Sequence, residues 1–284
     1  MGASAKTLLR LMEMTEEGRL SPGASICDIG TSQLSGPNAF ETARAFLAYY
    51  DERRADGASS LSDDRLRGIS NGGLLGEVLI DAGFEYVALD IFEAERTIVF
   101  DLNSHTPGPK LVGKFDLVTN FGTTEHVFNQ IEAFRTMHLL LKPDGLSFHD
   151  LPFSGFIKHG LFRYDPLFFS SLIKSNDYQL VRQTISTGAD QPVPKDLISQ
   201  GLDEKAVKNV GLEVILTKIA NSDFKVPLEM STSIAPFAAG VVDNEYVQLA
   251  NGKIIYGQTR SSFVFYLIQM AKRVRQALKR IVAR

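Results

Sequence analysis

The chain has 284 residues, which is enough for one large domain with appendages or for two small domains. Its residues are 44% apolar and 22% charged, as in globular proteins, and its single cysteine, Cys27, excludes an intrachain disulfide. The net charge is −3, no apolar stretch is long enough to span a bilayer, and no secretory signal is visible, so we expect a cytoplasmic protein.

Helical and strand patterns alternate along the chain. They predict helices over 5–18, 38–54, 74–82, 127–141 and 166–175, and strands over 25–30, 86–91, 97–102, 115–120, 146–151, 179–184 and 213–219. Such alternation is typical of a doubly wound, mostly parallel sheet. We therefore predict an α/β fold.

The segment between the first strand and the helix over 74–82 is longer than a single crossover helix requires. Its residues 55–71 are polar and rich in Gly, Ser and Asp, which predicts a loop. We interpret residues 37–70 as an insertion. Two interpretations stay open: a lid or part of a substrate pocket, or an external decoration.

Two predicted strands deliver an acidic residue to their carboxyl ends. The first brings Asp28 and Gly30 to a turn, and the strand over 86–91 brings Asp90. In open α/β sheets, ligands bind beyond these ends, where an acid can hold the hydroxyl pair of a ribose. The pattern therefore predicts a cofactor that contains a nucleoside.

Six short motifs follow one another along the chain. They are Cys27-Asp-Ile-Gly30, Leu89-Asp90, Phe100-Asp101-Leu102, Phe115-Asp-Leu-Val-Thr-Asn120, Thr124-Glu125-His126-Val127 and Leu140-Leu-Lys-Pro-Asp-Gly145. In this order they resemble the motifs of the class I S-adenosylmethionine-dependent methyltransferases. The resemblance covers residues 22–220.

This resemblance implies a seven-stranded, Rossmann-like methyltransferase domain over residues 1–225 with a helical insertion, followed by a C-terminal helical extension over 226–284. It implies S-adenosylmethionine as the cofactor, with Asp90 at the ribose and Asp101 at the adenine amino group. The cofactor-binding residues that it indicates are Asp28, Gly30, Thr31, Ser32, Gln33, Asp90, Ile91, Asp101, Leu102, Asn120, Phe121, Glu125 and His126.

Two other functions compete with this interpretation. A nucleotide-dependent oxidoreductase would need a Gly-x-Gly-x-x-Gly turn after the first strand, but this chain has Ser32 and Ser35 where later glycines would stand. The same atypical loop leaves open a non-catalytic binding or scaffold protein that keeps the methyltransferase fold. Tight binding of NAD would support the first alternative, and cofactor binding without turnover would support the second.

Methyl transfer to an oxygen atom often needs a base, and histidine suits that task near neutral pH. The candidates are His149 and His159, with Asp150 to orient a histidine or to bind a substrate hydroxyl. Strand alternation would turn either His149 or Asp150 away from the site. No spacing of ligands is diagnostic of a metal, so we predict none.

The segment Phe153 to Phe169 combines aromatic residues with Lys158 and Arg163, which suits a sugar, an aromatic ring or an anionic conjugate; a hydrophobic hairpin is an equal alternative. We therefore expect O-methylation of a small molecule or of a glycoconjugate acceptor. The resemblance suggests glycan biosynthesis.

The last predicted helix, Ser262 to Ala283, is amphipathic, and the chain after Glu245 carries eight lysine and arginine residues but no acid. Such a helix can lie on an anionic membrane surface, pack on the acidic body of the protein, or form a homodimer interface. Its basic residues are not interleaved with a platform of aromatic residues, so we expect no nucleic acid partner.

Overall fold

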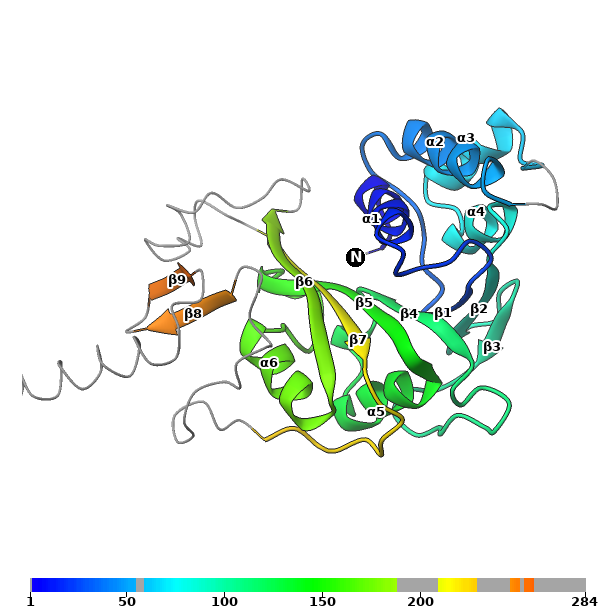
Figure 1. Cartoon of the computed structure of the whole chain (residues 1–284). Helices are drawn as coiled ribbons and strands as arrows, with labels where there is room; N and C mark the ends of the chain where they lie inside the picture. Colours follow the sequence, from blue (N-terminus) through cyan, green and yellow to red (C-terminus); the bar gives the residue numbers. More distant parts are fainter. Residues whose placement is uncertain (1, 55–58, 188–208, 229–245, 251–252, 258–284) are drawn as a thin grey trace, which may run out of the picture. The chain divides into compact units, whose positions relative to one another are not determined.

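The computed structural model describes residues 2–54, 59–187, 209–228, 246–250 and 253–257, which belong to two compact units (Figure 1). The second unit contains a hairpin of the antiparallel strands β8 (Tyr246–Ala250) and β9 (Lys253–Gly257). No helix in the described part of the chain is both long and apolar enough to cross a membrane. The predicted helix from Ser262 to Ala283 lies outside the described residues, and its membrane or homodimer contact stays a prediction.

The first unit is built on a seven-stranded sheet with the order β3-β2-β1-β4-β5-β7-β6. Strand β7 pairs antiparallel with β5 and β6, and the other pairs are parallel. This confirms the doubly wound, mostly parallel sheet. The strands are β1 (Ser25–Ile29), β2 (Glu85–Asp90), β3 (Thr97–Val99), β4 (Phe115–Phe121), β5 (Leu141–Gly155), β6 (Tyr178–Thr187) and β7 (Asn209–Lys218).

Different helices cover the two faces of this sheet (Figure 1). The helices are α1 (Ala5–Glu16), α2 (Ala39–Asp51), α3 (Asp63–Ser70), α4 (Leu75–Asp81), the 3₁₀ turn η1 (Thr124–His126), α5 (Gln130–Leu140) and α6 (Pro166–Ser175). On one face, α1 to α4 form a single buried apolar cluster with Phe148 of the sheet. On the other face, the ring of His149 contacts Phe134 of α5 and Phe169 of α6. Neighbouring residues of β5 thus serve different cores, because successive side chains of a strand point to opposite faces.

The prediction of a loop over residues 55–71 is wrong in its second half, where α3 forms. The side chain of Ser62 accepts a 3.3 Å hydrogen bond from the N–H of Arg65 and caps the helix. Leu66 and Ile69 are buried in the apolar cluster. This short polar segment has only two apolar side chains, which is too few to give a clear helical spacing, so the sequence pattern predicts a loop.

The proposed insertion over 37–70 is anchored through α2. Phe46 and Tyr50 of this helix are fully buried, and their rings contact each other with centroids 4.7 Å apart. Both rings also contact Phe84, just before β2. The helix therefore contributes to the core of the domain and is more than an external decoration.

Helix α5 and strand β5 begin at other residues than the sequence pattern predicts. The helix predicted over 127–141 begins only at Gln130, because Asn129 caps it by accepting a hydrogen bond from the N–H of Glu132. Strand β5 begins at Leu141 and not at residue 146, so it includes residues 142–145. There Asp144 has a φ of +61°, and the register with β4 shifts, as expected for a bulge.

Candidate functional site

A cavity of about 570 Å³ opens beyond the carboxyl ends of β1, β2 and β4. The strand order reverses here, and this is where doubly wound sheets bind their ligands. The predicted cofactor-binding residues that line the cavity are Gly30, Thr31, Ser32, Gln33, Asp90, Ile91, Asp101, Leu102, Phe121 and His126. Asp28, Asn120 and Glu125 lie outside its lining.

Gly30 allows two loops to meet beside this cavity. Its φ of +85° lies in the left-handed region that favours glycine. A Cβ atom on Gly30 would lie 2.2 Å from Oγ1 of Thr123, in the loop after β4. The N–H of Gly30 also donates a 2.8 Å hydrogen bond to the carbonyl of Leu89. No larger residue fits this position without moving Thr123.

The carboxylate of Asp90 is oriented by two backbone groups. Oδ2 accepts a 2.7 Å hydrogen bond from the N–H of Thr31, and Oδ1 accepts one of 3.2 Å from the N–H of Phe92. Each carboxylate oxygen has about two lone-pair sites, so both can accept a further hydrogen bond from a ligand. The carboxylate is therefore arranged to hold two neighbouring hydroxyl groups.

Asp28 supports the loop from behind, which corrects the expectation of a direct contact with a cofactor. Its fully buried carboxylate accepts hydrogen bonds from the hydroxyl of Thr119 at 2.6 Å, the N–H of Ser32 at 3.0 Å and the hydroxyl of Tyr86 at 3.1 Å. Burial raises the pKa of Asp28 to about 6, against the lowering effect of these hydrogen bonds.

Asp101 lines the cavity and also organises the turn after β3. Oδ1 accepts hydrogen bonds from the N–H and the side-chain amide of Asn103, at 2.9 and 3.0 Å, and Oδ2 accepts one of 2.8 Å from the hydroxyl of Ser104. These hydrogen bonds, the one from the Asn103 N–H above all, lower the pKa of Asp101. Asp101 therefore lines the cavity and also holds the turn after β3 in place.

Asn120 fixes the turn that follows β4 and does not reach the cavity. Its Nδ2 donates a 2.8 Å hydrogen bond to Oγ1 of Thr124, and its Oδ1 accepts one of 3.2 Å from the N–H of Thr124. The hydroxyl of Tyr164 lies 2.9 Å from the same Oγ1. This buried network holds η1, which carries Glu125 and His126.

His149 lies in the core on the face covered by α5 and α6, outside the lining of the cavity, which corrects its assignment as a candidate base. Its ring lies with its centroid 5.8 Å from that of Phe134 and 5.0 Å from that of Phe169. Its Nδ1 is 3.4 Å from Nδ2 of Asn120. Burial lowers the pKa of His149 to about 3. An imidazole that is neutral and weakly basic across the physiological range suits packing, not proton transfer.

Asp150 points to the opposite face, as strand alternation requires. Its Oδ2 lies 3.9 Å from Nζ of Lys6, and that ammonium group lies 3.0 Å from Oε2 of the buried Glu213. Asp150 therefore belongs to an ion-pair group between α1 and the sheet. It does not line the cavity, although its charge contributes to raising the pKa of Glu125.

Glu125, His126 and His159 form a cluster at the edge of the cavity, which His126 lines. Oε1 of Glu125 lies 3.5 Å from Nε2 of His159 and 3.9 Å from Nε2 of His126. Glu125 is 0% exposed, whereas the side chains of His126 and His159 are 48% and 33% exposed. Burial raises the pKa of Glu125 to about 7 and lowers the pKa of both histidines.

The loop over residues 156–163 brings His159 to this cluster. The N–H groups of Leu161 and Phe162 both donate to the carbonyl of Glu125, at 2.8 and 3.1 Å. A Cβ atom on Gly160 would lie 2.9 Å from Cγ of Glu125, so glycine permits the close approach. Sequence reasoning named all three cluster residues but gave no indication that the loop would place His159 beside Glu125.

Sequence reasoning missed several residues that line the cavity. They are Gly2, Ser35, Leu89, Phe92, Phe100, Asn103, Gly122, Thr123 and Val127. Most of them adjoin a predicted residue, so extending each motif by two positions would have found them. Gly2 carries no such signal; it reaches the cavity because the N–H of Ala3 donates to the carbonyl of Gln33.

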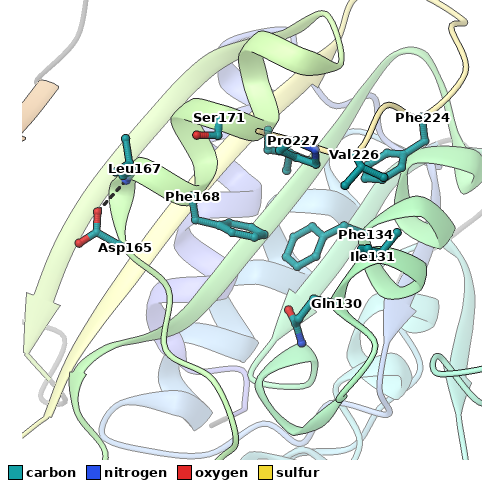
Figure 2. Close-up of a pocket in the computed structure, with 11 residues that line it drawn as sticks. Gln130, Ile131, Phe134, Asp165, Leu167, Phe168, Ser171, Phe224, Val226 and Pro227 are labelled. Carbon is teal, nitrogen blue, oxygen red and sulfur yellow. Dashed lines mark hydrogen bonds between the residues drawn. The ribbon is translucent and has the colours of Figure 1, made fainter. Parts of the chain in front are cut away.

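A second cavity, of about 350 Å³, lies between α5, α6 and the segment 224–227 (Figure 2). The rings of Phe134 and Phe168 contact each other in its wall, with centroids 4.8 Å apart. Its acidic lining residue, Asp165, accepts a 2.8 Å hydrogen bond from the N–H of Leu167 and caps α6. The other polar side chains of this mostly apolar lining are Ser171 and Gln130, and the amide of Gln130 is engaged in hydrogen bonds with Thr124, Val127 and Tyr164. The first cavity has oriented carboxylates in its lining, so it is the candidate active site.

Comparison with known families matches residues 40–186 to one described as "Methyltransferase domain". No curated protein matches the sequence. Similar solved structures include 1,6-didemethyltoxoflavin-N1-methyltransferase from Burkholderia thailandensis, at 13% identity over 75% of this chain and 76% of that chain with a TM-score of 0.42. Another is a TehB-like SAM-dependent methyltransferase from Corynebacterium glutamicum, at 14% identity over 74% of this chain and 86% of that chain with a TM-score of 0.39.

Proposed function

The chain belongs to the methyltransferase-domain family, and we propose that it transfers a methyl group to an oxygen atom of a small molecule or of a sugar in a glycoconjugate. The methyl donor is S-adenosylmethionine. One observation carries the choice of oxygen. A cluster of side chains with lone pairs, made of Glu125, His126 and His159, lies at the edge of the cofactor cavity.

The residues of the cavity fit this cofactor. A volume of about 570 Å³ is in the usual range for a pocket that encloses a small molecule. Asp90 offers two oriented carboxylate oxygens for the ribose hydroxyl pair. Gly30 lets the loops after β1 and β4 meet in the wall of the cavity, and apolar side chains such as Leu102 suit the adenine ring.

When bound, this cofactor supplies an electrophilic methyl carbon: an electron pair of the acceptor oxygen forms the new bond, the carbon–sulfur bond breaks toward sulfur to give S-adenosylhomocysteine, and the hydroxyl proton is released. The protein contributes mainly by holding the two reactants in line. Asp90 and the loop after β1 would fix the donor, and the loop over 156–163 would fix the acceptor.

The cluster favours oxygen over nitrogen as the acceptor atom. A hydroxyl group is a weak nucleophile until its proton is withdrawn, whereas a neutral amine attacks with its free electron pair. A buried carboxylate and two histidines beside the cavity provide a place where a hydroxyl can be bound and activated. We therefore assign acceptor activation to the cluster as a whole.

Aromatic and apolar side chains next to the cluster suit a ring or the face of a sugar. The rings of Phe128 and Phe162 contact each other with centroids 6.3 Å apart, and each residue adjoins part of the site: Phe128 follows Val127 of the cavity lining, and Phe162 donates its N–H to Glu125. Ile157 in the same loop is 76% exposed. This surface supports an acceptor with an apolar face.

The test uses the full chain with S-adenosylmethionine that carries a ¹³C-labelled methyl group. The acceptor panel contains phenols, sugars, carboxylic acids and amines, and the products are read by NMR. We expect the label in an O-methyl group. The Glu125→Gln variant should lose transfer but keep its affinity for S-adenosylhomocysteine. Glu93→Gln, at an exposed carboxylate that belongs neither to the cluster nor to the lining of the cavity, should keep both.

Two results would contradict the proposal. Label that appears only on nitrogen or carbon would show a different acceptor class. Binding of S-adenosylhomocysteine with no transfer to any member of the panel would favour the scaffold function that the atypical loop after β1 leaves open.

A further inference from the structure

The carboxylate of Glu125 is buried without a hydrogen-bond partner. Its residue is 0% exposed, and neither Oε1 nor Oε2 accepts a hydrogen bond from any described residue. Removing a carboxylate from water without a partner is expensive, and buried charges are normally paired or bound to a metal ion. Beside it lie two imidazole nitrogens, Nε2 of His159 at 3.5 Å and Nε2 of His126 at 3.9 Å from Oε1.

These three side chains have the spacing of a metal site. The ligand atoms all lie within 4.8 Å of one another. With bond lengths of about 2.0–2.2 Å, tetrahedral ligands of Zn²⁺ are about 3.3–3.6 Å apart, so the separation from Glu125 to His159 already fits. The half-exposed His126 is the ligand that must move: a rotation of its side chain has to shorten its separation from Glu125, now 3.9 Å, and bring it to the same spacing from His159. Two histidines and one carboxylate are also a donor set that leaves coordination positions open.

The backbone fixes this spacing. Glu125 and His126 are consecutive residues of η1, which the buried Asn120 and Thr124 hold in place. His159 comes from a loop that is tied to the same turn by the hydrogen bonds that the carbonyl of Glu125 accepts, and Gly160 lets the loop approach. The ligands are thus positioned by two elements that are bonded directly to each other.

We propose that Glu125, His126 and His159 bind a divalent transition metal ion of the Zn²⁺ type at the edge of the cofactor cavity. The sequence alone predicts no metal, because His159 follows His126 by 33 residues without a diagnostic spacing. In the folded chain the three side chains lie together, and this arrangement points to a metal site instead.

The ion would activate the acceptor, and this part rests on the proposed function. His126 lines the cavity, so an open coordination position beside it would face the acceptor. A divalent cation lowers the pKa of an oxygen that it binds, and the proton passes to solvent. The acceptor class is then a molecule with a hydroxyl group, or two neighbouring oxygen atoms, that can ligate the ion.

Metal binding is tested on the full chain after removal of metal with a chelator, by calorimetric titration with Zn²⁺ alone. We expect saturable binding of one ion per chain. Glu125→Gln and His159→Asn should each weaken it at least 10-fold, a loss already typical for groups that only support a ligand. His105→Asn is the matched control, because His105 is exposed and outside the cluster, and it should bind Zn²⁺ as the parent does.

Absence of saturable binding, or binding that both Glu125→Gln and His159→Asn leave unchanged, would overturn the site. If Glu125→Gln does not fold, His126→Asn, at a side chain with 48% exposure, replaces it. Binding of Mg²⁺ in preference to Zn²⁺ would also overturn it, because imidazole ligands suit the softer ion.

The acceptor role is tested separately. Metal-free protein should bind S-adenosylhomocysteine with unchanged affinity but transfer methyl groups at least 10-fold more slowly, and Zn²⁺ should restore the rate. Transfer that is equally fast without metal would overturn the acceptor role and leave the binding site standing. Failure to bind S-adenosylhomocysteine would instead contradict the proposed function, whatever the Zn²⁺ titration gives.

Discussion

The N–H of Thr31 donates a 2.7 Å hydrogen bond to Oδ2 of Asp90, so the acid at the end of β2 fixes the loop that follows β1. The other oxygen, Oδ1, accepts a hydrogen bond from the N–H of Phe92. With both oxygens oriented before a ligand arrives, less conformational freedom is lost on binding. One carboxylate therefore organises the loop and presents the acceptors for a ribose.

Replacement of Asp90 by asparagine should weaken cofactor binding while the loop stays in place. The amide oxygen can still accept from Thr31, but the amide nitrogen cannot accept from a ribose hydroxyl. A hydrogen bond to a charged group contributes about 1.5–3 kcal/mol, so we expect S-adenosylhomocysteine to bind roughly 10- to 100-fold more weakly in a calorimetric titration. The exposed Glu93→Gln is the control, and equal affinity in both variants would remove the ribose role from Asp90.

Gly30→Ala should disrupt the cavity itself. The new methyl group would lie 2.2 Å from Oγ1 of Thr123, and alanine is strained at a φ of +85°. We expect a loss of about 1–3 kcal/mol in the free energy of unfolding, measured by urea denaturation, together with loss of S-adenosylhomocysteine binding.

Two further variants separate the contact from the backbone strain. Gly72→Ala shares a positive φ of +101° but has no neighbour within 4 Å, so it should lose stability and keep cofactor binding. Adding Thr123→Ala to Gly30→Ala removes the closest atoms and should recover part of the lost stability. If the two changes are instead additive, the contact between these loops is not what makes glycine necessary.

Much of the fold and of the cofactor cavity follows from sequence pattern. The carboxyl ends of parallel strands meet at one edge of a sheet, so residues at the ends of separate predicted strands, such as Gly30, Asp90 and Asp101, can be assigned to one cavity from the sequence alone. The direction in which an individual side chain points cannot be predicted in this way. Alternation shows that His149 and Asp150 point to opposite faces of the sheet, but not which face each of them takes.

The cluster at the edge of the cavity cannot be predicted from sequence pattern. His159 reaches Glu125 only because a loop approaches η1 closely at Gly160, and such tertiary contacts leave no periodic signal. The expected contact of Asp28 with a cofactor is wrong for a related reason. An acid at the end of a strand can face the ligand or support the loop, and the partners of Asp28, Thr119 and Tyr86, come from distant segments.

Substitution of His149 should reduce stability without changing the chemistry. His149→Leu removes the contact with Nδ2 of Asn120, and we expect the free energy of unfolding to fall by about 1–3 kcal/mol. The pKa of His149, lowered to about 3, keeps its ring neutral from pH 5 to 9. The pH profile of kcat should therefore match that of the parent, and loss of the limb on which the rate falls at acidic pH would restore His149 as a candidate base.

Asp28 should make the protein less stable as pH rises from about 4 to 6. Its pKa is raised from 3.8 to about 6 in the folded state, so the folded state binds the proton more tightly than the unfolded state does. The stability that this protonation contributes is present at low pH and lost as pH rises through the folded pKa; two pKa units correspond to about 3 kcal/mol. Urea denaturation of the parent and of Asp28→Asn at several pH values isolates this contribution, because other groups titrate in both proteins. A stability difference that does not change between pH 4 and 7 would contradict the raised pKa.

Gly160→Ala should separate acceptor activation from cofactor binding. The added methyl group would lie 2.9 Å from Cγ and 3.1 Å from the carbonyl oxygen of Glu125, so the loop over 156–163 must shift and carry His159 away from the cluster. A displacement of about 1 Å of a catalytic group can reduce a rate roughly 100-fold. We expect kcat to fall at least 10-fold while the affinity for S-adenosylhomocysteine stays within about twofold, since Asp90 and Gly30 are untouched. Gly108→Ala, with no neighbour within 4 Å, is the matched control and should leave both values unchanged. If Gly160→Ala keeps the parental kcat, the close approach of this loop to Glu125 plays no part in the transfer.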